Sequence, residues 1–198
     1  SGWVSQTNVV DSSPNAVYAV GANGTGSAEL TSPVYALPTD PLQLSLRHNY
    51  DLEANVGSVG LDGAVLEIKI GTNAFTDIIT AGGSFVSGGY NYNVSASFGN
   101  PLAGRQAWSG SSSGFVTTTV NLPAAVAGQN VQFRWRIGSD SGNASIGWYV
   151  DTINVNGRAC LCCSGGTNAP ALPAQTNRTL IELNSLIITN TATDADLP

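Results

Sequence analysis

Residues 134–155 read RWRIGSDSGNASIGWYVDTINV, and this stretch decides the fold class of the chain. Its start belongs to a run, 131–137, in which apolar and polar residues alternate. The apolar parity holds Val131, Phe133, Trp135 and Ile137. A period of two predicts a β-strand with one buried face and one wet face. A loop rich in Gly, Ser and Asn follows, and a second strand begins at Gly147.

The alternation changes parity inside this second strand. Trp148 and Val150 share one parity, whereas Ile153 and Val155 share the other. The extra residue of a β-bulge re-aims every side chain that follows it. The change falls at Asp151, so we predict a bulge there and expect the strand to turn a side chain toward a site.

Other segments alternate in the same way. Inward positions are expected at Leu42, Leu44, Leu46, His48 and Tyr50, and again at Ala64, Leu66, Ile68 and Ile70, with Glu67 and Lys69 outward. About ten short strands separated by turn signals are typical of an antiparallel β-sandwich. We therefore predict an all-β fold of two sheets, with jelly-roll connectivity preferred.

The composition narrows the class of protein. The 198 residues are 10% charged and include 23 Gly and no Met, which suits short strands and polar turns in an extracellular protein. Seven Lys and Arg against thirteen Asp and Glu argue against nucleic-acid binding, which needs a basic surface. No run of about 20 apolar residues predicts a membrane span. If the protein is exported, we expect its signal peptide to have been removed already.

The three cysteines lie together at Cys160, Cys162 and Cys163. This spacing, with a single His in the chain, falls short of a four-ligand zinc site. A disulfide from Cys160 to either of the other two would leave one thiol free or paired to another chain.

The composition shifts after residue 163. We predict a sandwich domain over 1–163, an extended linker over 164–174 and a tail over 175–198. The tail contains a strand-like segment, 179–189 (TLIELNSLIIT), whose apolar residues are Leu180, Ile181, Leu183, Leu186, Ile187 and Ile188. A strand this apolar is expected to pair with the rest of a second domain or with a neighbouring molecule's sheet.

Six segments along the chain resemble MAM-like jelly-roll modules of secreted bacterial proteins. They are SAELTSPVYAL, LSLRHNYDLE, DGAVLEIKIG, NPLAGRQAWSG, RWRIGSDS and GWYVDTINVNGRAC. The nearest likeness is to the modules appended to immune-inhibitor-A-type metallopeptidases. The resemblance covers roughly residues 15–160 and implies a two-sheet sandwich that often holds calcium and is not catalytic. The zinc motif HExxH of those peptidases is absent here, and the tail resembles the start of a cadherin-like or Ig-like repeat.

Catalysis finds little support in the residue types present. His48 is predicted to be a hydrogen-bonded core residue, since no serine nucleophile motif accompanies it. Asp51 and Glu53 are a carboxylate pair of the kind glycosidases use, but nothing in the sequence sets their separation. We therefore expect no enzymatic activity.

A structural calcium site is the stronger expectation. Calcium binds several oxygen ligands on irregular backbone, and carboxylates occur at the predicted strand ends. The candidate ligands, which the family resemblance also matches, are Glu53, Asp62, Asp140 and Asp151. The alternative is that the loop carboxylates cap turns and that Asp151 pairs with Arg134 or Arg136.

Two functions follow from this sequence. The first is a non-catalytic structural or adhesive building block of a cell-surface or filamentous assembly, in which the segment 179–189 completes a neighbour's sheet. The eleven residues of the linker 164–174 extend to about 35 Å, enough to reach another subunit. The second is a carbohydrate-binding accessory module of a larger secreted enzyme, for which Tyr149 is the best candidate for an exposed contact.

Overall fold

The structure is a computed structural model that describes residues 2–55, 57, 59–143 and 145–157. These residues belong to one compact unit, Ser1–Arg158. The expected boundary at residue 163, the linker, the tail and the three cysteines lie outside the described residues. Within the described part, the only helix is a 3-10 turn at Ala124–Val126. None of the described helical structure has the length and apolarity to cross a membrane.

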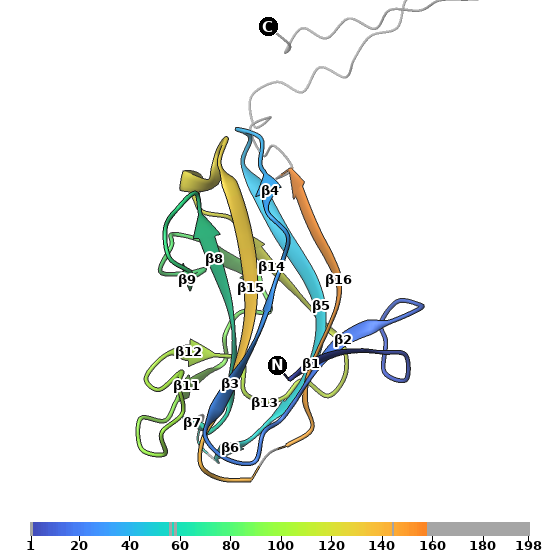
Figure 1. Ribbon diagram of the computed structural model, residues 1–198, viewed down its shortest axis with the longest axis vertical. Coiled ribbons are helices and arrows are strands. Elements are labelled where there is room, and N and C mark those ends of the chain that lie inside the picture. Colours follow the sequence, from blue (N-terminus) through green and yellow to red (C-terminus); the bar gives the residue numbers. More distant parts are fainter. Residues whose placement is uncertain (1, 56, 58, 144, 158–198) are drawn as a thin grey trace, which may run out of the picture. The chain divides into compact units, whose positions relative to one another are not determined.

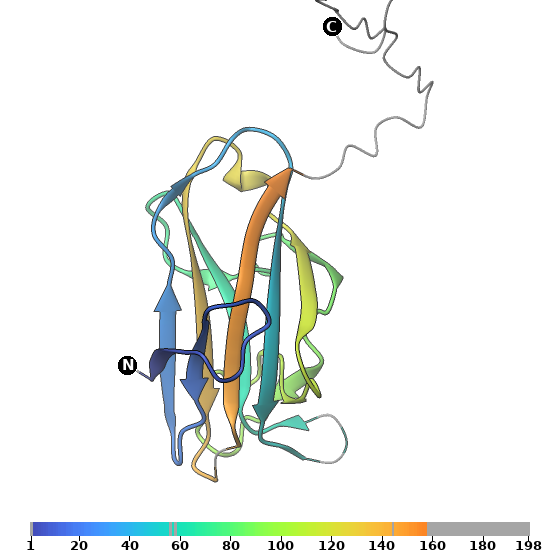
Figure 2. The same ribbon diagram turned by 90° about the vertical axis from the view of Figure 1, so that its right-hand side faces the viewer.

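The all-β class is confirmed, and one face of the domain is a seven-stranded sheet (Figures 1 and 2). Its strand order is β1-β2-β16-β5-β14-β10, with β13 also paired to β5. The bounds are β1 Trp3–Gln6, β2 Ala16–Val20, β16 Gly147–Gly157, β5 Leu42–Leu52, β14 Val116–Asn121, β10 Ser84–Ser87 and β13 Gly110–Ser111. All its pairings are antiparallel.

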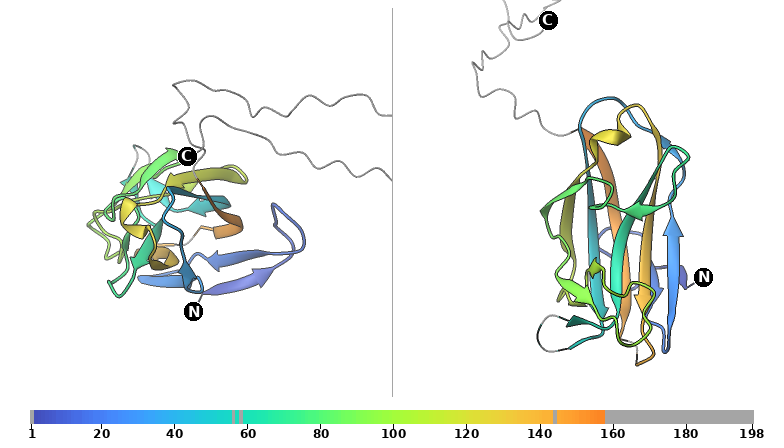
Figure 3. Two further views of the ribbon diagram at one scale, coloured as in Figure 1. Left: turned by 90° about the horizontal axis from the view of Figure 1, so that it is seen from above. Right: turned by 90° about the vertical axis from the view of Figure 1, so that its left-hand side faces the viewer.

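A five-stranded sheet packs against the inner face of the first, as Figure 3 shows from above. Its order is β3-β15-β8-β9, and β4 also pairs with β15. The bounds are β3 Gly26–Thr31, β15 Asn130–Ser139, β8 Gly63–Ile70, β9 Thr76–Asp77 and β4 Tyr35–Ala36. The two antiparallel layers are consistent with a β-sandwich.

The core lies between these two sheets and follows the predicted alternation. In β5 every second residue from Leu42 to Leu52 is buried, and β15 buries Val131, Phe133, Trp135 and Ile137. The apolar ones among these side chains, together with Trp108 and Trp148, form one hydrophobic cluster. Burying each large apolar side chain contributes about 1.5–3 kcal/mol, so this cluster is the main source of stability.

A third, four-stranded sheet departs from a two-layer description. Its order is β12-β11-β7-β6, with bounds β12 Gln106–Ala107, β11 Tyr92–Val94, β7 Val59–Gly60 and β6 Ala54–Asn55. The pairing of β11 with β7 is parallel. A small apolar cluster of Val65, Val94, Leu102 and Ala107 joins this sheet to the outward face of β8.

This third sheet explains one wrong prediction. Glu67 was expected to face solvent, but it is 3% exposed, because β8 is buried on both faces from Gly63 to Ile68. The Glu67 carboxylate lies 2.6 Å from Arg105 and 2.6 Å from Arg134. Burial by itself would raise the pKa of Glu67, but hydrogen bonds from the two arginines outweigh it and lower the pKa. The alternation along β8 correctly predicted which residues share a face. It could not predict that the third sheet covers the face that holds Glu67.

His48 is confirmed as a hydrogen-bonded core residue. It is fully buried, and the Trp148 indole N–H donates to His48 Nδ1 over 3.2 Å. An indole nitrogen only donates, so Nδ1 is the acceptor and His48 Nε2 carries the proton. Nε2 lies 2.9 Å from Thr118 Oγ1, and the Thr118 hydroxyl donates to the Gly88 carbonyl at 2.6 Å. Burial, assisted by the nearby charge of Arg47, lowers the pKa of His48 to about 3.

The buried imidazole makes stability depend on pH. Between pH 6.5 and 3 the unfolded chain binds a proton at His48 that the folded chain does not bind. The free energy of unfolding should therefore decrease as the pH is lowered through this window, by at most about 1.4 kcal/mol per pH unit. His48→Gln, which retains an acceptor and a donor, should remove this contribution. Urea titrations of both proteins from pH 7 to pH 4 measure it, and parallel pH profiles would contradict it.

Candidate metal centre

Three of the four predicted ligands come from strand ends that meet at one end of the sandwich. Glu53 follows β5 of the seven-stranded sheet, whereas Asp62 precedes β8 and Asp140 follows β15 of the five-stranded sheet. Because Gly63 lies opposite Gly138 in the β8–β15 register, the residues just beyond this pair are neighbours. The cluster therefore joins the two sheets.

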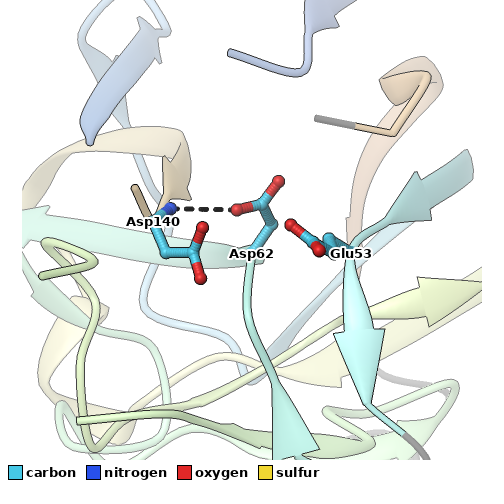
Figure 4. Close-up of side chains that lie close together, drawn as sticks. All are labelled: Glu53, Asp62 and Asp140. Atoms are coloured by element: carbon cyan, nitrogen blue, oxygen red, sulfur yellow. Dashed lines mark hydrogen bonds between the residues drawn. The ribbon is translucent and has the colours of Figure 1, made fainter. Parts of the chain in front are cut away.

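Backbone hydrogen bonds hold the three residues in place. The N–H groups of Leu61 and Asp62 both donate to the Glu53 carbonyl at 2.9 Å, which closes the loop between β5 and β8. Ser109 Oγ donates to the Asp62 carbonyl at 2.6 Å. The Asp140 N–H donates to Asp62 Oδ1 at 3.0 Å, the bond drawn in Figure 4.

The carboxylates converge on one point. One oxygen from each of Glu53, Asp62 and Asp140 lies within 4.8 Å of the other two (Figure 4). The loop after Asp140 closes over them at Gly142, whose N–H donates to Asp140 Oδ1 at 2.6 Å. A Cβ at this glycine would lie 3.0 Å from Asp140 Oδ1 and 3.2 Å from Glu53 Oε2. A side chain there would crowd the carboxylates.

The cluster is electrostatically unbalanced within the described residues. Asp62 is 1% exposed, and its Oδ2, like Glu53 Oε2, is buried without a hydrogen-bond partner. Burial raises the pKa of Asp62 to about 6; the Asp140 N–H opposes this shift, and the charges of Asp140 and Glu53 add to it. Burial and the charge of Asp140 also raise the pKa of Glu53. An unpaired buried carboxylate is costly, so this site favours a bound cation.

The residues fit calcium. Calcium–oxygen distances are about 2.3–2.6 Å, so ligands on opposite sides of the ion are separated by about 5 Å. The 4.8 Å spread of the three oxygens is compatible with this separation. Calcium takes six to eight oxygens, so backbone carbonyls or water would complete the shell. Because the donors are all carboxylate oxygens, a hard cation is favoured over zinc.

Asp151, the fourth predicted ligand, lies elsewhere. The expected bulge is confirmed, because the β16–β5 register shifts between Asp151 and Asn154. Asp151 pairs in register with Arg47, in the middle of β5, whereas the metal cluster lies beyond the end of that strand. The alternative, a pairing of Asp151 with Arg134 or Arg136, is also not formed: Arg134 and Arg136 contact Glu29 and Glu67 instead.

The Asp151 carboxylate instead holds the N-terminal loop. Its Oδ2 accepts hydrogen bonds from the backbone N–H groups of Asp11 and Ser12 at 2.9 and 3.0 Å, and its Oδ1 accepts one from Ser12 Oγ at 2.8 Å. Burial opposes ionisation, but the hydrogen bonds from Ser12 and Asp11 lower the pKa of Asp151. No local pattern in the sequence links residues 140 positions apart, so this role was not predicted.

A second acidic group is already neutralised. The Glu67 carboxylate shares Arg105 with Asp77, which lies 2.8 Å from that guanidinium, and the Tyr90 hydroxyl donates to Asp77. Sequence reasoning missed this network, because its members come from separated segments of the chain. Its three arginines balance three carboxylates, so it does not favour a cation; they are Arg105, Arg134 and Arg136 with Glu29, Glu67 and Asp77.

Comparison with models of protein families finds no match to this chain. Comparison with curated proteins finds no significant match either. The candidate site is therefore interpreted from its own geometry.

Calcium should stabilise the folded protein. A ligand at one hundred times its dissociation constant contributes about 2.7 kcal/mol to the free energy of unfolding. We expect calcium to raise the melting temperature and a chelator to reverse the rise. Asp62→Asn should abolish the calcium effect, whereas Asp40→Asn, at an exposed loop carboxylate, should retain it. Differential scanning calorimetry measures both, and a chelator without effect on the wild type would overturn the site.

Asp151→Ala should destabilise the fold without changing the response to calcium. The substitution leaves three backbone N–H groups and two hydroxyls without this acceptor, a loss of about 1–3 kcal/mol. The free energy of unfolding, measured by urea titration with and without calcium, separates the two effects. Loss of the calcium response in Asp151→Ala would indicate instead that Asp151 is a metal ligand.

Proposed function

We propose that this chain is a non-catalytic extracellular β-sandwich module with a structural calcium ion, acting as a structural or adhesive building block of a cell-surface or filamentous assembly. The observation that carries the proposal is Asp62, which is buried with one carboxylate oxygen unpartnered beside Glu53 and Asp140. Carboxylates from both sheets meet at this end of the domain, so a bound ion would connect the two layers.

A structural role suits the ion better than a catalytic one. Its three candidate ligands are tied to backbone at strand ends, and Gly142 lies against two of them. The single histidine of the chain, the residue type most often used for general acid–base catalysis, is buried in the core with both ring nitrogens in hydrogen-bonding contacts. These features support a structural module rather than an enzyme.

The MAM-like jelly-roll assignment forms the finer part of this proposal. Its support is that the six resembling segments coincide with β3, β5, β8, β12, β15, β16 and their loops. The same likeness supports an extracellular location, where millimolar calcium fills weak sites.

Assembly is proposed to depend on the segment 179–189. Its support is the sequence: six of its eleven residues are Leu or Ile, which a solvated strand does not tolerate. Pairing with a neighbouring subunit would bury these side chains.

One observation favours the alternative, a carbohydrate-binding accessory module. Tyr149 is half-buried, and its ring stacks on that of Tyr18 with centroids 4.4 Å apart. Paired aromatic rings at a sheet surface are a surface on which sugar rings can stack. Glycan binding that is lost in Tyr149→Ala, with no assembly of the wild type, would favour this alternative.

The assembly proposal is tested by comparing the full chain with a chain that ends at Pro173. We expect ordered oligomers or filaments from the full chain and monomers from the shorter one, because only the full chain carries the apolar segment. Size-exclusion chromatography and negative-stain microscopy in calcium measure the difference. Monomers from both chains would overturn the assembly proposal, and equal assembly of both would place the contact outside the tail.

A further inference from the structure

An apolar groove of about 710 Å³ opens on one side of the sandwich. It lies between the last residues of β16 in the seven-stranded sheet and β3 and β4 in the five-stranded sheet. Its lining is mainly apolar and includes Val17, Leu30, Tyr35, Trp135, Ile153 and Val155. Both Tyr35 and Ile153 are large side chains left substantially exposed, at 46% and 40%.

One wall of this groove is a strand edge without a partner. Over its first four residues, Gly147 to Val150, β16 pairs with β2 on one side and β5 on the other. From Asn154 to Gly157 only the pairing with β5 continues among the described residues. The loop before β2 contacts Asp151 and Thr152 at the bulge, so the free edge begins beyond that contact.

The buried floor of the groove also carries an unpartnered donor. Trp135 is 3% exposed and lines the groove, and its indole N–H has no acceptor among the described residues. A buried indole N–H normally has a partner. A peptide backbone entering the groove would bring carbonyl oxygens close to it.

We infer that this groove accepts the segment 179–189 of a neighbouring copy, which pairs with the free edge of β16 and fills the groove with its apolar side chains. The inference rests on the proposed function and identifies the acceptor that it requires. β-Strand addition suits such an edge, since main-chain hydrogen bonds supply affinity and alternate side chains enter pockets.

The segment is long enough for the groove. The free edge from Asn154 to Gly157 is about 14 Å long at about 3.4 Å per residue, and the segment has residues to span it. One parity of the segment holds Ile181, Leu183 and Ile187, which would face the groove. The other parity holds the two most polar central residues, Glu182 and Asn184, which would face solvent, together with Leu180, Leu186 and Ile188.

The chain length permits the exchange. Gly157 itself lines the groove, and residues 158–178 separate it from the segment. These 21 residues extend to about 70 Å, which exceeds the reach needed to cross to a neighbour. A subunit that donates one tail and accepts another forms a head-to-tail contact, which propagates into a ring or a filament.

The test places charge on the groove of the full chain. Ile153→Asp and Tyr35→Asp change exposed groove residues, so folding should be retained. The matched control is Val86→Asp, at a residue 57% exposed on β10, the opposite edge of the same sheet. We expect the groove variants to weaken assembly roughly tenfold or more, as judged by analytical ultracentrifugation, while the control assembles like the wild type.

A mixing experiment then distinguishes donor from acceptor. Ile153→Asp retains an intact tail, and Leu183→Asp retains an intact groove. Each alone should remain monomeric, whereas their mixture should form discrete one-to-one dimers. Hydrogen exchange should show that the amides of residues 154–157 that face away from β5 become protected in the dimer.

The outcomes separate this inference from the assembly proposal. If wild type and groove variants assemble equally in a tail-dependent way, the acceptor lies elsewhere and the assembly proposal stands. If the wild type is monomeric, the assembly proposal and this inference are both overturned. The same holds if the groove binds the tail of its own chain, because the protein would then also be monomeric. Monomeric variants whose mixture forms no dimer would overturn the exchange between copies.

Discussion

The contact between the inward faces of β5 and β16 and those of β8 and β15 is the interaction on which the rest of the structure depends. Alternating side chains from the two sheets interdigitate there around Trp108 and Trp148. The imidazole of His48 in this layer is satisfied internally, since it accepts from Trp148 and lies within hydrogen-bonding distance of Thr118. This layer sets the distance between the two sheets. That distance determines which strand ends and strand edges come together at the margins of the sandwich.

Those margins carry the candidate metal site and the apolar groove. At one end, β5, β8 and β15 stop close together, so that loops from both layers bring three carboxylates to one place. Buried carboxylates repel one another and lack the hydration they would have in water, so a cation there would tie the layers together. Along one side, β2 turns away before β16 ends, which leaves a strand edge over an apolar groove. A bound ion would neutralise the carboxylates at the first margin, and an added strand would pair with the edge of β16 at the second.

The strand pattern of the sandwich was largely predictable, because a period of two reports directly which side chains face a core. The faces of β5 and β15 and the bulge at Asp151 follow from it. Glu67 was wrongly placed outward, since alternation cannot reveal that a third sheet covers the second face of β8. Three predicted calcium ligands come together because their strands end at one end of the sandwich. Asp151 was predicted as a ligand from the bulge and the family resemblance, neither of which gives its distance from the other three.

By itself, the sequence determined the all-β class, the inward face of each long strand, the parity change in β16 and the apolar character of the segment 179–189, because each is a local property of consecutive residues. Only the tertiary structure decided which carboxylates meet, where Asp151 points and which strand edge stays open. These depend on register and on the order of strands in the sheets, and they join residues up to 140 positions apart. Local periodicity carries no information about such pairings.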